Sequence, residues 1–247
     1  MSKSYNILAV IPARGGSKAV PRKNIKYLCN YPLIHYMLRS ALESEMLDCV
    51  AVSSEDEEIL NVANLLGKIN DKFALVKRPK NLARDETPTL PVVQHALKKL
   101  EEESGKEFDF VVLLHAVSPL TTAEDIDSAI RKLIETKADS VVSVYKVEGE
   151  MHPVKMKGIK DDRLYQYVSS MPETGFRRQD FESIYKRSGG VYAVTRELVI
   201  TGNFNLGFFC GKDTRPYIMP KERAIDIDTE VDFEIARFLM EKLKRTV

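Results

Sequence analysis

The chain has 247 residues, of which 44% are hydrophobic, and a formal net charge of +1 at pH 7. That length suits one α/β domain or two smaller ones with a sizeable core. The near-neutral charge excludes the broad positive field that gathers nucleic acid. Apolar runs stay below the roughly 18 residues that a membrane span needs, and the N-terminus leads directly into a strand-like run, so we expect neither a membrane anchor nor a signal peptide.

The three cysteines, Cys29, Cys49 and Cys210, are an odd number without metal-ligand spacing. Such cysteines are typical of reduced thiols in a cytoplasmic protein. We therefore expect a cytoplasmic protein with no disulfide framework.

The first predicted element is a strand at residues 7–11, which runs into a cationic loop. The run is short, rich in branched side chains and ended by Pro12, a pattern typical of a strand buried on both faces. In the loop, Gly15 and Gly16 let backbone N–H groups approach an oxygen atom. The loop carries five cationic side chains, Arg14, Lys18, Arg22, Lys23 and Lys26, and the first acidic residue of the chain, Glu43, comes only after it. Because lysine and arginine bind phosphate oxygens, the loop predicts a triphosphate site; a solvated basic loop beside a structural glycine turn is the alternative.

The positions of glycine and lysine in the loop limit which class of phosphate-binding protein it can belong to. Neither the P-loop pattern G-x-x-x-x-G-K-[ST] nor G-x-G-x-x-G occurs, which argues against a P-loop kinase and a dinucleotide-dependent dehydrogenase. A strand and loop of the nucleotidyltransferase kind remains, in which the loop wraps the nucleotide and a metal offsets its charge.

Apolar runs and helical patterns then alternate along the chain. Further strands are predicted at 49–52, 73–76, 108–114, 139–145, 189–194 and 217–219, and helices at 33–42, 55–66, 90–103 and 122–136. The alternation up to residue 145 predicts an α/β fold, a mostly parallel Rossmann-like nucleotidyltransferase sheet with helices on both faces and the strand at 108–114 in a central position. Ligands of such sheets bind at the carboxyl ends of the strands. The segments expected there are 13–24, 53–56, 78–89 and 115–121, although the acidic run from Glu55 to Glu58 is interpreted as solvated helix surface.

Residues 148–187 interrupt this alternation. They are polar and rich in turn residues, with hairpin-like runs at 154–158 and 163–167. Because they contain too few apolar residues to fold alone, they predict a partner surface, most simply a second copy of the chain. We therefore expect one domain, residues 1–247, with 148–187 as a dimerisation subdomain of a homodimer; a mobile surface flap is the alternative.

Two aspartates near the C-terminus, Asp226 and Asp228, alternate with isoleucines. In an extended segment both carboxylates face one side, about 6–7 Å apart, and repel each other unless a cation lies between them. Mg²⁺ prefers hard oxygen ligands and commonly bridges carboxylates to substrate phosphates, so the pair predicts a magnesium site. In the alternative, Asp228 caps the following helix and Asp226 is solvated. Thr229 and Asp232 resemble a capping box for a helix that extends to about Lys244.

Four motifs occur in order over nearly the whole chain. They are Pro12-Ala-Arg-Gly-Gly-Ser-Lys18 with Pro21-Arg-Lys-Asn24, Leu114…Ser118-Pro-Leu120, Arg178-Gln179…Gly189-Gly-Val-Tyr192, and Asp226-Ile-Asp-Thr-Glu-Val-Asp232. Together they resemble the CMP-sialic acid synthetases, or acylneuraminate cytidylyltransferases. Residues 87–93 also resemble members that activate bacterial nonulosonates such as legionaminic acid.

This resemblance implies an enzyme that uses Mg²⁺, CTP and a 2-keto-3-deoxy sugar acid. The anomeric hydroxyl of the sugar acid would attack the α-phosphorus, and pyrophosphate would leave. The implied catalytic residues are Arg14, Lys23, Asp226 and Asp228, the last two as metal ligands. The implied nucleotide contacts are Ala13, Arg14, Gly15, Lys18, Lys23, Asn24, Arg78 and Thr89. The implied sugar contacts are His115, Lys155, Arg178, Gln179 and Ser188, with the excursion at 148–187 reaching into the site of a neighbouring subunit.

Three departures from the family pattern fall on the implied sugar side. The segment that begins at His115 replaces Gln-Pro-Thr, Thr121 replaces an arginine, and Ser188 replaces an asparagine. His115 either donates a hydrogen bond to the sugar or is a satisfied histidine at a strand end. The pattern thus specifies the cytidylyl half of the reaction more closely than the sugar. The functional alternatives are a nucleotidyltransferase for another base or sugar acid, such as 3-deoxy-octulosonate, and a non-catalytic nucleotide-binding protein.

Overall fold

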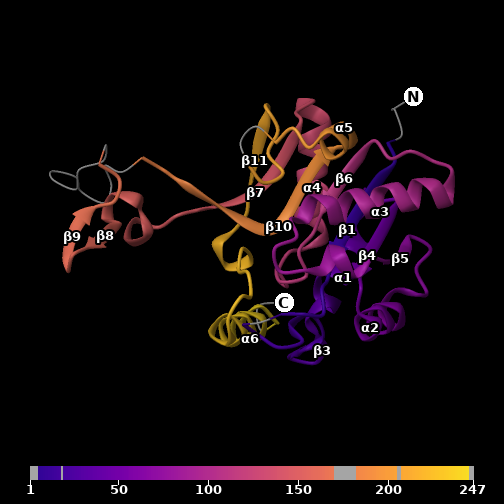
Figure 1. Cartoon of the computed structure of the whole chain (residues 1–247), viewed down its shortest axis with the longest axis horizontal. Helices are drawn as coiled ribbons and strands as arrows, with labels where there is room; N and C mark the ends of the chain where they lie inside the picture. The colour runs from indigo at the N-terminus through magenta and orange to yellow at the C-terminus, as the bar shows by residue number, and fades with distance from the viewer. Residues whose placement is uncertain (1–4, 18, 170–181, 205–206, 245–247) are drawn as a thin grey trace.

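A computed structural model describes residues 5–17, 19–169, 182–204 and 207–244. Its centre is a seven-stranded sheet with the strand order β11-β7-β10-β6-β1-β4-β5 (Figure 1). The strands of this sheet are β1 (Ile7–Pro12), β4 (Cys49–Ser54), β5 (Phe73–Lys77), β6 (Phe110–Leu113), β7 (Ser140–Lys146), β10 (Tyr185–Thr195) and β11 (Thr214–Ile218). Two short pairs lie outside it: β2 (Tyr27–Leu28) with β3 (Tyr31–Pro32), and β8 (Lys157–Lys160) with β9 (Arg163–Gln166).

Helices cover both faces of the sheet, as expected. They are α1 (Leu33–Glu43), α2 (Glu57–Gly67), α3 (Thr89–Ser104), α4 (Ala123–Thr136), α5 (Arg196–Thr201) and α6 (Glu230–Lys244). Alternate residues of β1 enter different cores: Ile7 and Ile11 pack with α1, α2 and α4, whereas Leu8 and Val10 pack with α3 and α5. The prediction that this strand is buried on both faces is therefore confirmed. Among the described helices, none combines the length and the apolar content that crossing a bilayer would require.

The parallel core of the sheet follows the sequence prediction. The strand pairs β5–β4, β4–β1 and β1–β6 are all parallel, and β6 is the middle strand. The helix that follows β6 begins with the expected capping box, in which Thr122 and Asp125 exchange side-chain and backbone hydrogen bonds. The carboxyl ends of these four strands therefore lie along one edge and carry their loops to the same place.

In the other half of the sheet, β7 and β11 pair in parallel, and a strand that runs in the opposite direction separates them from β6. β10 lies between β6 and β7 and is antiparallel to both. Its register with β7 shifts between Arg187 and Tyr192. Such irregularities release backbone groups from the ladder and redirect them, often beside active sites. Here the released N–H of Gly189 donates to Asp226 instead.

The excursion projects from the body as an arm that carries the β8–β9 hairpin at its far end, beyond the sheet (Figure 1). The predicted hairpin is present, with Ile159 opposite Leu164 in the ladder, but its first strand begins at Lys157 because Pro153–Lys155 form a short 3-10 helix. Both side chains are exposed, at 74% and 73%. Ile159 and Leu164 therefore face solvent instead of packing into a core. This agrees with the expectation that the arm cannot fold alone.

The segment that carries the two aspartates is less regular than the expected extended strand. Residues 224–229 have no assigned strand; instead, the N–H of Ile227 donates to the carbonyl of Val117, and the Ile227 side chain is fully buried. The predicted capping box of α6 is confirmed by hydrogen bonds between Thr229 and Asp232. The segment is therefore anchored to the loop after β6 and by the start of α6.

Candidate active site

Two adjoining cavities lie at the carboxyl edge of the sheet, with volumes of about 520 and 650 Å³. The loops after β1, β5 and β6 line the first cavity. The second cavity is lined by the loop after β6, by residues of β10 itself and by the segment before α6. The residues that line both are Arg14, Thr89, His115, Val117 and Asp228. The two cavities therefore form one cleft with a shared wall.

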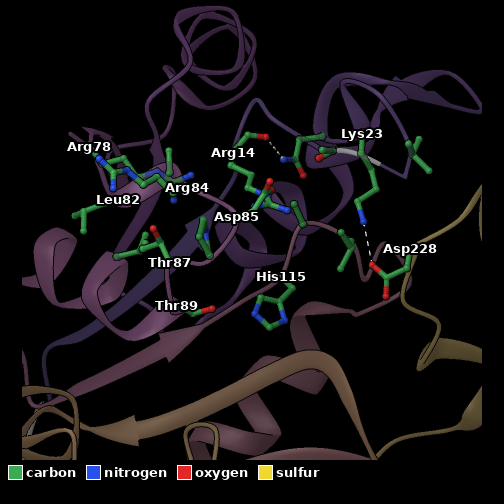
Figure 2. A pocket seen from close by; sticks show the side chains of 18 of the residues that line it. Arg14, Lys23, Arg78, Leu82, Arg84, Asp85, Thr87, Thr89, His115 and Asp228 are labelled. Atoms are coloured by element: carbon green, nitrogen blue, oxygen red, sulfur yellow. Dashed lines mark hydrogen bonds and ion pairs between the residues drawn. The ribbon is translucent and has the colours of Figure 1, made fainter. Parts of the chain in front are cut away.

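Lys23 and Asp228 join the two ends of the chain in this cleft (Figure 2). The Nζ of Lys23 donates to the Asp228 carboxylate over 3.0 Å and to the carbonyl of Ile227 over 2.6 Å. The Lys23 side chain is 12% exposed, whereas that of Asp228 is 77% exposed. The ammonium group therefore occupies a position where a cation neutralises the more accessible of the two aspartates.

Asp226 lies deeper in the second cavity. Its carboxylate accepts hydrogen bonds from the Gly189 N–H at 2.9 and 3.1 Å and from the Ser118 hydroxyl at 2.5 Å. Gly189 is needed for this contact, because a Cβ there would lie 2.5 Å from the Asp226 Oδ1. Burial raises the pKa of Asp226, and the nearby charge of Asp228 acts in the same direction. A cation beside these carboxylates would oppose both effects.

The four described cations of the first loop all have acidic partners. Arg14 bonds Asp85 over 2.8 Å and still lines both cavities. Arg22 binds Asp56 and Glu58, and Lys26 binds Glu230. Arg22 and Lys26 thus tie the loop to α2 and α6, whereas the triphosphate site expected at the loop stays a prediction. Lys18 lies outside the described residues.

Ala13, Gly15 and Asn24 support the wall of the cleft. The Asn24 side chain donates to the Arg14 carbonyl over 2.9 Å and also lines the first cavity. Ala13 is fully buried and bonds Ser53 through its N–H. At Gly15, a Cβ would lie 2.4 Å from the Asp56 carboxylate, so this glycine permits close packing of the loop onto the end of β4. Their predicted nucleotide contacts remain predictions.

Arg78 lies at the end of the first cavity opposite Lys23, whereas Thr89 lies nearer His115, on the wall that the two cavities share (Figure 2). Arg78 is 5% exposed and forms an ion pair with Glu55. Glu55 also accepts from the N–H of Gly15. The interpretation of Glu55 as solvated helix surface is therefore wrong: α2 begins only at Glu57, with Asp56 as its N-cap, and the Glu55 side chain turns inward to Arg78.

The predicted sugar contacts divide into three groups. His115 and Ser188 line the second cavity. Lys155 lies in the arm and is absent from the lining of both cavities, and Arg178 and Gln179 lie outside the described residues. His115 packs near Tyr192, with ring centroids 5.6 Å apart. Burial lowers the pKa of His115 to about 4, so its imidazole is neutral at pH 7 and can donate one hydrogen bond.

Sequence reasoning missed two cations of the second cavity, Lys186 and Arg187 of β10. Their signal was a basic pair immediately before Ser188 and Gly189, in a strand that returns to the ligand edge of the sheet. It also left Arg84 and Asp85 unassigned, although both lie in the predicted 78–89 segment and line the first cavity. The cleft therefore carries more positive charge than the first loop alone supplies.

The cleft at the carboxyl edge of the sheet brings cations from the N-terminal half of the chain together with two aspartates from its C-terminal half. A model of the cytidylyltransferase family matches residues 8–237. The chain belongs to this family and is an enzyme, a nucleotidyltransferase.

Relatives of known name agree with this assignment. The chain is 32% identical over 232 residues to the pseudaminic acid cytidylyltransferase of Campylobacter jejuni, a match that covers 94% of this chain and 95% of the relative. It is 30% identical over 237 residues to N-acylneuraminate cytidylyltransferase A of Danio rerio, covering 95% of this chain and 50% of the relative. Among solved structures, a CMP:2-keto-3-deoxy-manno-octonic acid synthetase complexed with CTP shares the fold, with a TM-score of 0.66, 17% identity and coverage of 96% and 99%.

Proposed function

We propose that this enzyme transfers the cytidylyl group of CTP to a nonulosonic, sialic-acid-like sugar. The anomeric oxygen of the sugar forms a bond to the α-phosphorus, the bond from that phosphorus to the β-phosphate oxygen breaks, and pyrophosphate leaves. The products are the CMP-sugar and pyrophosphate. One observation carries the proposal: Arg14, Lys23 and Asp228 line one cavity, although the first two lie some two hundred residues before the third.

The first cavity suits CTP. Arg14 and Lys23 would bind the phosphate chain and stabilise the leaving pyrophosphate, because in nucleotidyl transfer the protein mainly positions groups and neutralises developing charge. Arg78 lies at the opposite end of this cavity, where the base would lie, and Thr89 would contact the nucleotide from the wall shared with the second cavity. The salt bridges to Asp85 and Asp228 would then be exchanged for phosphate oxygens and a metal.

Asp226 and Asp228 are the groups that would hold Mg²⁺. Within the described residues, no cluster of three or more His, Cys, Asp or Glu side chains could hold a metal ion by itself. Two carboxylates completed by substrate phosphates fit Mg²⁺, which is commonly bound in that way. The ammonium group of Lys23, 3.0 Å from the Asp228 carboxylate, supports a position that favours a cation. Bound there, the ion would withdraw negative charge from the phosphates.

The second cavity suits the sugar acid. Lys186 and Arg187 offer positive charge for a carboxylate, and Ser188 and neutral His115 line the same cavity as polar groups. Named relatives of similar length act on pseudaminic acid, which supports a nonulosonic acid over 3-deoxy-octulosonate. The octonic acid synthetase shares the fold at only 17% identity. The three free thiols fit a reducing compartment, so we place the reaction in the cytoplasm.

A substrate panel tests this proposal. With Mg²⁺ present, purified enzyme is expected to release pyrophosphate from CTP and a nonulosonic acid, but not from ATP, GTP or UTP. Pseudaminic, legionaminic and N-acetylneuraminic acids would be compared with 3-deoxy-octulosonate. Release with 3-deoxy-octulosonate alone would replace the proposed sugar, and absence of release with every pair, together with undisturbed CTP binding, would leave a nucleotide-binding protein.

We further propose that the enzyme works as a homodimer through its arm, residues 148–187, which would bring Lys155 and the predicted contacts Arg178 and Gln179 to the partner's cleft. The support is the exposed apolar pair Ile159 and Leu164. Analytical ultracentrifugation is expected to show a dimer for the wild type and a monomer for Ile159→Glu, because a buried unpaired carboxylate opposes association.

Lys160→Glu, a charge reversal at an exposed site of the same strand, serves as the matched control and is expected to remain dimeric. A monomeric wild-type protein at micromolar concentration would overturn the assignment of the arm.

A further inference from the structure

Glu55 connects two loops of the proposed nucleotide site. Its carboxylate Oε1 accepts from the Gly15 N–H over 2.8 Å. Its Oε2 accepts from Arg78 Nε and Nη2 over 3.1 and 2.8 Å. Glu55 is 14% exposed and Arg78 is 3% exposed in their side chains, so this ion pair is shielded from solvent.

The topology of the sheet explains why this residue can reach both loops. β4 lies between β1 and β5, and Glu55 directly follows β4. Gly15 is in the loop after β1, and Arg78 directly follows β5. A side chain at the end of the middle strand is therefore flanked by both neighbouring loops.

Glu55 also fixes how Arg78 is presented. The Nε–Nη2 edge of the guanidinium is used by the carboxylate, whereas Nη1 has no hydrogen bond within the described chain. Arg78 nevertheless lines the first cavity. Its remaining donors are thus available to a ligand, and the side chain is prevented from turning away.

We propose that Glu55 is a positioning residue that holds the glycine turn and Arg78 in their CTP-binding arrangement. The inference rests on the proposed function. It requires a carboxylate, because each oxygen accepts from a different donor. A glutamine has one acceptor oxygen and one donor NH₂, so it can satisfy Gly15 or Arg78 but not both.

The test is Glu55→Gln, which keeps the size of the side chain. Loss of one charge-assisted hydrogen bond is expected to raise the KM for CTP about tenfold. The kcat is expected to change little, because Arg78 lies at the opposite end of the first cavity from Lys23 and Asp228 and would act on ground state and transition state alike. Glu57→Gln is the matched control: this exposed carboxylate two residues on pairs with Lys77 and should leave both constants unchanged.

A crystal structure of the wild-type enzyme with CTP supplies a measurement that does not depend on the folding of a variant. The Glu55 contacts to Gly15 and Arg78 should both persist with CTP bound. Release of either contact, or a Glu55→Gln variant with the KM of Glu57→Gln, would overturn the inference and leave the proposed function standing. Wild-type enzyme that fails to bind CTP in calorimetry would remove the proposed function and this inference together.

Discussion

An Asp228→Ala variant is expected to fold normally and to turn over substrates about 10³-fold more slowly than the wild type, the size of effect found when a preorganised electrostatic group is removed. Asp228 is one of two carboxylates proposed to hold Mg²⁺ beside the reacting phosphate. Without it, negative charge on the leaving pyrophosphate would be less stabilised, so the loss should appear in kcat. Pyrophosphate release at saturating CTP measures it directly.

The fold should tolerate this change. The Asp228 side chain is 77% exposed, and a salt bridge of this kind contributes about 0–1 kcal/mol to stability. Glu230→Ala is the matched control. Glu230 is an exposed acid two residues after Asp228, and its carboxylate binds Lys26. It should keep most of the activity. Full activity of Asp228→Ala would remove the metal assignment, and a large fall in its melting temperature would show a structural role instead.

A Lys23→Met variant should have a kcat/KM for CTP about 10²-fold below that of the wild type. Methionine keeps a long unbranched side chain but removes the ammonium group, with its charge and its N–H donors. The lost ammonium lies 3.0 Å from Asp228 and 2.6 Å from the Ile227 carbonyl. It would otherwise bind phosphate and fix the segment that carries the aspartates. Steady-state kinetics at varied CTP concentrations test the expectation.

Lys26→Met is the control for Lys23→Met. Lys26 belongs to the same basic segment, but it binds Glu230 and lies over the Phe233 ring at 4.9 Å from the centroid. Its charge serves α6 rather than the cleft, so its variant should keep most of the wild-type kcat/KM. Equal losses in the two lysine variants would indicate a general effect of the basic loop rather than a specific role for Lys23.

Local patterns in the sequence were sufficient for most of the fold. The apolar run at 7–11 gave a strand buried on both faces, and the Thr122–Asp125 and Thr229–Asp232 pairs capped the helices they were expected to cap. These features depend on spacing within a few residues, which the sequence displays directly. The parallel direction of β1, β4 and β6 followed from the alternation of strands and helices.

Long-range pairings were beyond such patterns. Nothing local shows that β10 inserts between β6 and β7, because its neighbours are chosen by packing after the chain returns from the arm. Glu55 illustrates the same limit. Its acidic surroundings are typical of a solvated helix start, and only the order of strands brings it between Gly15 and Arg78.

The sequence by itself determined the class of fold, the cationic loop after the first strand and the pair of aspartates near the C-terminus. Only the tertiary structure decided that Lys23 meets Asp228, that Arg22 and Lys26 bind elsewhere, and that Glu55 is shielded from solvent. The physical reason is that charge is a property of a residue, whereas the partner of a charge depends on which strand ends the sheet places side by side.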